Sequence, residues 1–359
     1  MVDIGIDKIQ LNDFGVREID LDHLRALATR TNKIKIISHS GQQGLRVEIY
    51  DGEKFAQLVV GQNWYHANRR WYVNLTLSPT YVNGHNLYNM SCTDYKKELP
   101  EILEYIKDTY RIDLDSEGVK IKTMEINCNI VLQQRYTSYV RVTRLLMSLL
   151  EIKCATMHDV NDGQTLMRKN KSIAVSIYNK RAQLKSKCKC KKELDDQDDP
   201  DIMRIEIRLL HSHKVEDVFG HNLWEKLDDG AVSEYMCRYI TAHITEQYLE
   251  WCVQREEELV EMIIDKKERH KTKWQEAVIA QIRNKSEDKC IPYILDLEQV
   301  CDALYRLPDP HHNRSKVRNS LLSKKVDNDL YHNNDRAKVW EILGVFSPGH
   351  TRQIPTDLT

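Results

Sequence analysis

The chain has 359 residues, of which 41% are hydrophobic and 30% are charged, and its formal net charge is −1. No apolar run approaches the roughly 20 residues that a membrane-spanning helix needs, and the N-terminus lacks the apolar core of a secretory signal. We therefore predict a cytoplasmic protein with no membrane partner. Because the net charge is close to zero, a polyanionic partner would have to be bound by a local cluster of cations.

The N-terminal part of the chain is rich in short apolar or alternating runs, which are typical of β-strands. Strands are predicted at residues 45–50, 55–61, 71–77, 119–132, 172–178 and 202–210, and helices at residues 95–110 and 136–150. Regular strand–helix alternation with glycine-rich crossovers is absent. We therefore expect an α+β fold with a mostly antiparallel sheet and flanking helices.

A charge-segregated segment follows Tyr178. Its basic part begins at Lys180 and Arg181 and includes Lys185, and its acidic part covers residues 193–201. Such a segment is typical of an exposed, mobile hairpin loop. Beyond residue 214 the strand patterns end.

Amphipathic helices are predicted at residues 234–252, 256–283 and 336–343. The expected organisation is an α+β domain at residues 1–225 and an all-helical region at residues 226–359.

Three predicted strands, at residues 124–130, 172–180 and 203–209, place apolar side chains on one face only. Their opposite faces carry side-chain types that phosphate chemistry uses. These are two carboxylates, a tyrosine and three cations: Glu125, Glu206, Tyr178, Lys180, Arg204 and Arg208. If the three strands are neighbours in the sheet, all of these side chains lie on one face.

This set of residues suits phosphodiester chemistry. Carboxylate oxygens are the ligands that Mg²⁺ and Mn²⁺ prefer, and such a cation polarises a phosphate. Tyrosine is a covalent nucleophile once it loses the proton that it holds with a pKa of about 10. Lysine and arginine bind phosphates. The pattern by itself leaves an alternative open, in which each polar face is only solvated and Glu206 forms surface ion pairs with its neighbouring arginines.

Four segments, in chain order, resemble the gene II/X replication initiators of filamentous phages and their plasmid and mobile-element relatives. The segments are WYVNLTLSPTYVNGHNLYN at residues 71–89, KTMEINCNI at 122–130, NKSIAVSIYNKRAQL at 170–184, and IMRIEIRLL with HKVEDVFG between 202 and 220. The resemblance covers residues 1–225. It implies a rolling-circle replication initiator that nicks one DNA strand at a specific site and leaves a 3′-OH primer.

The resemblance also implies roles for individual residues. Tyr178 is expected to become covalently attached to the 5′ phosphate through a surface or partly exposed hydroxyl, with Lys180 as the adjoining cation. Glu125 and Glu206 are expected to bind Mg²⁺ or Mn²⁺. Contacts to DNA are expected from five residues: Arg181, Lys185, Arg204, Arg208 and His85.

The partners implied are single-stranded DNA or an origin hairpin, together with a host helicase and polymerase. The helical region is expected to supply origin recognition or homodimer contacts.

Two other interpretations stay open. A conjugative relaxase uses the same chemistry, and a DNA-binding regulator could keep the fold without cutting. Asn74 stands where filamentous-phage members tend to carry an acidic residue, so we expect no metal ligand from that strand. Close approach of Tyr178, Glu125 and Glu206 would favour the enzymes, and their dispersal would favour the regulator.

Overall fold

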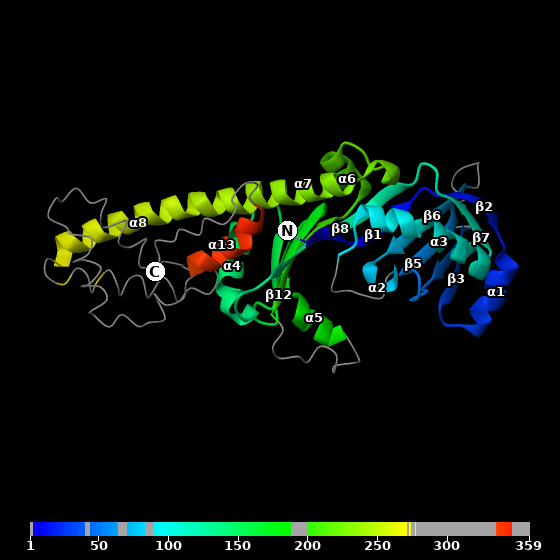
Figure 1. Cartoon of the computed structure of the whole chain (residues 1–359), viewed down its shortest axis with the longest axis horizontal. Helices are drawn as coiled ribbons and strands as arrows, with labels where there is room; N and C mark the ends of the chain where they lie inside the picture. The colour runs from blue at the N-terminus through cyan, green and yellow to red at the C-terminus, as the bar shows by residue number, and fades with distance from the viewer. Residues whose placement is uncertain are drawn as a thin grey trace.

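A computed structural model of the chain describes residues 3–39, 44–63, 70–82, 89–187, 200–270 and 335–346, with two isolated positions at 273 and 277. The described residues form an α+β protein around a large antiparallel sheet (Figure 1). The sheet has ten strands in the order β3-β4-β5-β6-β1-β8-β12-β11-β10-β9, and β2 and β7 form a separate two-stranded ribbon. This confirms the expected fold class.

The strands are β1 (Asp3–Asn12), β2 (Gly15–Ile19), β3 (Ile34–His39), β4 (Gly44–Ile49), β5 (Gln57–Asn63), β6 (Arg70–Leu77), β7 (Ile112–Asp115), β8 (Lys120–Val131), β9 (Thr156–Val160), β10 (Thr165–Lys169), β11 (Ile173–Asn179) and β12 (Ile202–Leu209). The helices are α1 (Leu21–Arg30), α2 (Pro79–Val82), α3 (Cys92–Tyr110), α4 (Val140–Leu149), α5 (Lys180–Lys187), α6 (Ser212–Phe219), α7 (Asp229–Ile240), α8 (Glu246–His270) and α13 (Asp335–Leu343).

The N-terminal strand β1 lies in the middle of the sheet. It pairs with β6 through residues 9–12 and with β8 along almost its whole length. Four strands lie on one side of β1, in the order β3-β4-β5-β6. Five lie on its other side, in the order β8-β12-β11-β10-β9, so within the sheet β1 alone joins the two groups.

The apolar face of the sheet packs against helices. Residues Ile6, Ile126 and Ile207 from three adjacent strands are fully buried there. Helix α7 contacts β1 and β8, and α6 contacts β8 and β12. Helix α6 begins at a cap in which the His211 ring accepts from the backbone N–H of Lys214, and it ends at Gly220 in the left-handed conformation. These two caps set the first and last residues of α6, the helix that packs on β8 and β12.

The hydrophobic core does not end at the expected domain boundary. Val232 and Met236 of α7 and Ile342 of α13 belong to the same buried cluster as the sheet residues. Helix α13 is also tied to the end of η1 (Tyr136–Tyr139), because Glu341 accepts from the Tyr139 hydroxyl at 2.6 Å. Among the described residues, the part after residue 225 thus packs as an extension of the sheet's core.

Two predicted elements differ from the structure. The described part of the basic stretch expected in an exposed loop, residues 180–187, is helix α5, in which Lys180 and Arg181 are buried. Residues 188–192 lie outside the described part. The break expected between two long helices at residues 253–255 is absent, because α8 runs through these residues without interruption. Helix α7 in turn continues through the π-helical turn Thr241–Thr245 directly into α8. The loop expectation followed charge alone, which does not show which cations pack against the sheet. The acidic residues 193–199 lie outside the described part. Within the described part, no helix combines the length and apolarity that crossing a bilayer requires.

Candidate metal centre beside a buried tyrosine

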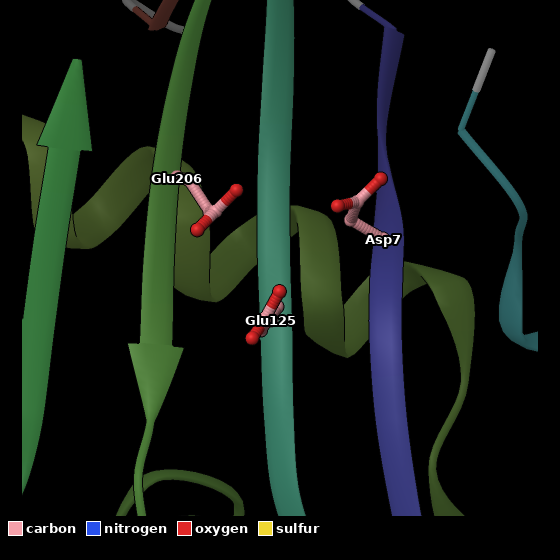
Figure 2. Close-up of side chains that lie close together, drawn as sticks. All are labelled: Asp7, Glu125 and Glu206. Atoms are coloured by element: carbon pink, nitrogen blue, oxygen red, sulfur yellow. The ribbon is translucent and has the colours of Figure 1, made fainter. Parts of the chain in front are cut away.

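Three carboxylates from three adjacent strands meet on the polar face of the sheet. Asp7 comes from β1, Glu125 from β8 and Glu206 from β12, and one oxygen of each lies within 4.8 Å of the others. Figure 2 shows the three side chains pointing toward one another in front of the sheet, with a helix behind it. We call these residues the acidic trio. The structure confirms the expectation that Glu125 and Glu206 lie on neighbouring strands and on one face.

A β-bulge lies at Asp7. The register of β1 against β8 runs from Ile6 opposite Ile126 to Lys8 opposite Glu125, so Asp7 is an extra residue without a partner. The extra residue allows both Ile6 and Ile9 to stay on the buried apolar face, where each is fully buried. Asp7 and Lys8 then share the polar face, and the charge of Lys8 acts on Glu125.

Tyr178 lies next to the acidic trio on β11. Its hydroxyl donates to Oε2 of Glu206 at 3.0 Å. The side chain is only 2% exposed, so the expectation of a surface or partly exposed hydroxyl is wrong. Burial, followed by the negative charge of Glu206, raises the pKa of Tyr178 above its usual value, while Arg204 opposes the rise. The tyrosine is therefore protonated at neutral pH and donates its proton to a carboxylate.

Arg204 has no exposed surface and forms the floor of the site. Its Nη1 donates to Asp7 at 2.8 Å, its Nε donates to the Asn129 amide oxygen at 2.7 Å, and its Nη2 donates to the Asn89 amide oxygen at 3.3 Å. Held in this way, the guanidinium fixes the carboxylate of Asp7. The expected contact of Arg204 with DNA stays a prediction.

Arg208 neutralises the other two carboxylates. Its Nε donates to Oε1 of Glu206 and lies 3.8 Å from Oε1 of Glu125. The side chain is 35% exposed, whereas Glu206 is 2% exposed. Arg208 is therefore one of two cations of the site that solvent and ligands can reach, the other being the exposed Lys8. The expected contact of Arg208 with DNA stays a prediction.

The electrostatics of the site are dominated by crowding of negative charge. Burial and the neighbouring charge of Glu206 raise the pKa of Glu125 to about 7, although Arg208 and Lys8 favour its ionised form. A divalent cation would relieve this repulsion, because it favours the ionised form of every ligand.

The donor set fits a hard divalent cation. All three groups are carboxylates, and oxygen ligands of this kind suit Mg²⁺ and Mn²⁺, whereas zinc and copper sites usually include nitrogen or sulfur ligands.

One further polar group lies inside the cluster. Asn127 follows Glu125 by two residues on β8 and sits directly opposite Glu206 on β12. It is fully buried, and neither its amide oxygen nor its amide nitrogen has a hydrogen-bond partner. Buried side-chain amides without any partner are rare in folded proteins.

The remaining predicted site residues are more dispersed. Lys180 begins helix α5, is 1% exposed, and donates to the Gln183 amide oxygen at 3.2 Å. Arg181 is also buried, and Lys185 is partly exposed on the same helix. Their roles toward phosphate and DNA stay predictions. His85 lies outside the described residues.

Asp7 is the member of the trio that the sequence pattern did not identify. The signal lay in the segment IGIDKIQL, where apolar residues at positions 4 and 6 are followed by apolar residues at 9 and 11. Two consecutive polar residues inside such a strand indicate a bulge. Comparisons of the chain with protein-family models, with curated proteins and with solved structures find no match.

Proposed function

We propose that this chain is a metal-dependent DNA nicking and closing endonuclease of the rolling-circle type. The observation that carries the proposal is the hydrogen bond of 3.0 Å from the Tyr178 hydroxyl to Glu206. Because Glu206 belongs to the acidic trio, a potential nucleophile stands beside the residues that would hold a divalent cation. The resemblance to gene II/X initiators supports the same assignment, since Glu125, Tyr178 and Glu206 each come from one of its segments.

In the proposed reaction, the Tyr178 oxygen forms a bond to the scissile phosphorus while the bond from phosphorus to the 3′ oxygen breaks. The products are a 5′-phosphotyrosine and a free 3′-OH, which acquires its proton from solvent. The hydroxyl proton of Tyr178 passes to the Glu206 carboxylate that already accepts it. In the closing step the oxygen of a 3′-OH forms a bond to the phosphorus while the bond from phosphorus to the Tyr178 oxygen breaks. Glu206 returns the proton to Tyr178, and the proton of the 3′-OH passes to solvent.

The surrounding residues have distinct tasks in this scheme. Asp7, Glu125 and Glu206 would hold the cation, and Arg204 keeps Asp7 in place. A bound divalent cation would supply charge neutralisation at the phosphate. Arg208, which is partly exposed, would meet a phosphate oxygen.

The burial of Tyr178 sets a condition on this scheme. Because the side chain is 2% exposed, the groups that cover its hydroxyl must move when DNA binds. Its raised pKa also means that attack requires a proton acceptor within hydrogen-bond distance, and Glu206 is that acceptor. The regulator interpretation needs neither condition.

The test is incubation of the full chain with supercoiled plasmid carrying the DNA that adjoins its gene, in the presence of Mg²⁺ or Mn²⁺. We expect nicked product and a covalent protein–DNA adduct on the peptide that contains Tyr178. Tyr178→Phe should form neither. The matched control is Tyr136→Phe, because Tyr136 is also buried and hydrogen-bonded through its hydroxyl.

Several outcomes would contradict the proposal. An adduct on another tyrosine would exclude Tyr178 as the nucleophile. Undiminished nicking by Tyr178→Phe would do the same. Tight binding of the plasmid without any nicking by the wild-type chain would favour the DNA-binding regulator instead.

A further inference from the structure

We infer that the amide oxygen of Asn127 is a fourth protein ligand for the cation that the acidic trio binds. The inference rests on the metal site of the proposed function, and it does not depend on Tyr178 being a nucleophile. It adds a neutral ligand to three charged ones, at a strand position next to Glu206 and Glu125.

The position of Asn127 follows from the registers of three strands. On β8 it lies two residues from Glu125, so both side chains project from the same face. Across the sheet it is paired with Glu206 on β12 and with Gly5 on β1. Directly paired residues in antiparallel strands have Cβ atoms about 4.5–5.5 Å apart. The side chain of Asn127 therefore lies next to those of Glu206 and Glu125, two of the three carboxylates of the trio.

The amide of Asn127 has no partner among the groups around it. Both polar atoms are buried and make no hydrogen bond. Leaving a buried donor or acceptor unsatisfied costs about 1–3 kcal/mol. Gly5, on one side, has no side chain with which to pair. A cation at the trio would turn this cost into a favourable contact, because an amide oxygen is a hard ligand.

The neighbouring asparagine shows the contrast. Asn129 lies two residues further along β8 on the same face, and its amide oxygen accepts from Nε of Arg204 at 2.7 Å. Arg204 directs its other donors to Asp7 and Asn89. The guanidinium of Arg204 thus gives Asn129 a hydrogen-bond donor. Asn127, which lies between Asn129 and Glu125 on β8, has no hydrogen-bond partner.

The test measures Mn²⁺ binding to the full chain in the absence of DNA, by calorimetry or by electron paramagnetic resonance. Asn127→Leu keeps the approximate shape of the side chain and removes both polar atoms. We expect it to weaken Mn²⁺ binding by about 10-fold or more, since loss of residues that only orient ligands already costs about 10–100-fold. Its stability to urea in the presence of a chelator should not fall, because the atoms removed are unpaired.

A second variant and a control complete the experiment. Asn127→Asp should bind Mn²⁺ at least as tightly as the wild type at pH 8, because a carboxylate replaces the amide ligand. This variant decides the matter if Asn127→Leu does not fold. The control is Asn74→Leu on β6, which removes an amide bonded to Lys122. It should leave Mn²⁺ affinity unchanged.

The outcomes separate this inference from the proposed function. Wild-type Mn²⁺ affinity in Asn127→Leu would overturn the inference and leave the trio intact. Equal losses of affinity in the Leu and Asp variants would also overturn it. Absence of Mn²⁺ binding by the wild type would overturn both the inference and the metal site. Loss of Mn²⁺ binding in Asn127→Leu, combined with a wild-type chain that binds Mn²⁺ and does not nick DNA, would support the inference and refute the function.

Discussion

Glu125→Gln should stabilise the metal-free protein above neutral pH. The side chain is 24% exposed, and its pKa is raised from 4.5 to about 7 by burial and by the charge of Glu206. Below pH 4.5 the carboxyl is protonated in both the folded and the unfolded chain. Between pH 4.5 and 7 the unfolded chain loses this proton first, so the free energy of unfolding falls as the pH rises.

The size of the effect follows from the same pKa values. At about 1.4 kcal/mol for each pH unit, the rise from 4.5 to about 7 corresponds to a loss of up to about 3 kcal/mol by pH 8. Glutamine carries no charge, so Glu125→Gln should escape this loss. The difference in stability between variant and wild type should therefore grow by up to about 3 kcal/mol from pH 4.5 to 8.

The assay is urea denaturation at pH 4.5, 6 and 8 in the presence of a chelator. Glu101→Gln, at an exposed position on α3, is the control and should follow the wild type at every pH. Added Mn²⁺ should stabilise the wild type at pH 8 and should have little effect on Glu125→Gln. If the two proteins instead show the same pH dependence, the carboxylates of the trio do not repel one another as the structure indicates.

Three other changes have expected outcomes. Arg204→Met should lower the free energy of unfolding by about 1.5–3 kcal/mol, because it removes the charged hydrogen bond to the half-buried carboxylate of Asp7. Urea denaturation measures this, and a loss under 1 kcal/mol would contradict it. Arg208→Ala should tighten Mn²⁺ binding at pH 8.5, because the guanidinium no longer competes with the cation for Glu206 and Glu125. Weaker binding in calorimetry would argue against such competition. A chain ending at Asp228 should be insoluble, because it lacks the buried apolar side chains of α7 and α13. Each such side chain contributes about 1.5–3 kcal/mol to the free energy of unfolding. A soluble fragment with cooperative unfolding would refute this.

The common face of Glu125 and Glu206 was predicted from the alternation of apolar and polar residues in the sequence. Glu125 and Glu206 each sit in a strand whose other face is apolar, so their common face followed from period-two spacing alone. Tyr178 lies on β11, which is buried on both faces. The alternation of apolar and polar residues in this strand therefore could not predict that the Tyr178 hydroxyl is buried. The antiparallel α+β class was predicted for the same reason, from short strands without regular helical crossovers.

Other features depend on contacts between distant segments. Asp7 reaches the site only because β1 pairs with β8, a strand more than 100 residues further along the chain. Arg204 is buried because Asp7 and Asn89, far away in the sequence, supply its acceptors. Strand β9 was not predicted, since each of its residues is exposed and alternation gives no signal there. Local pattern identifies residue types on a face, and the long-range pairing decides which of them become buried partners.

The central position of β1 has a consequence for the order of folding. Its neighbours in the sheet end at residues 77 and 131, and the trio is complete only when β12, ending at residue 209, has paired with β8. Such distant pairings carry a high cost of loop closure and form slowly. During synthesis, β1 would have to wait until residue 131 has left the ribosome before both of its neighbours exist. Cation binding would therefore appear late in folding, as a mark of a finished sheet.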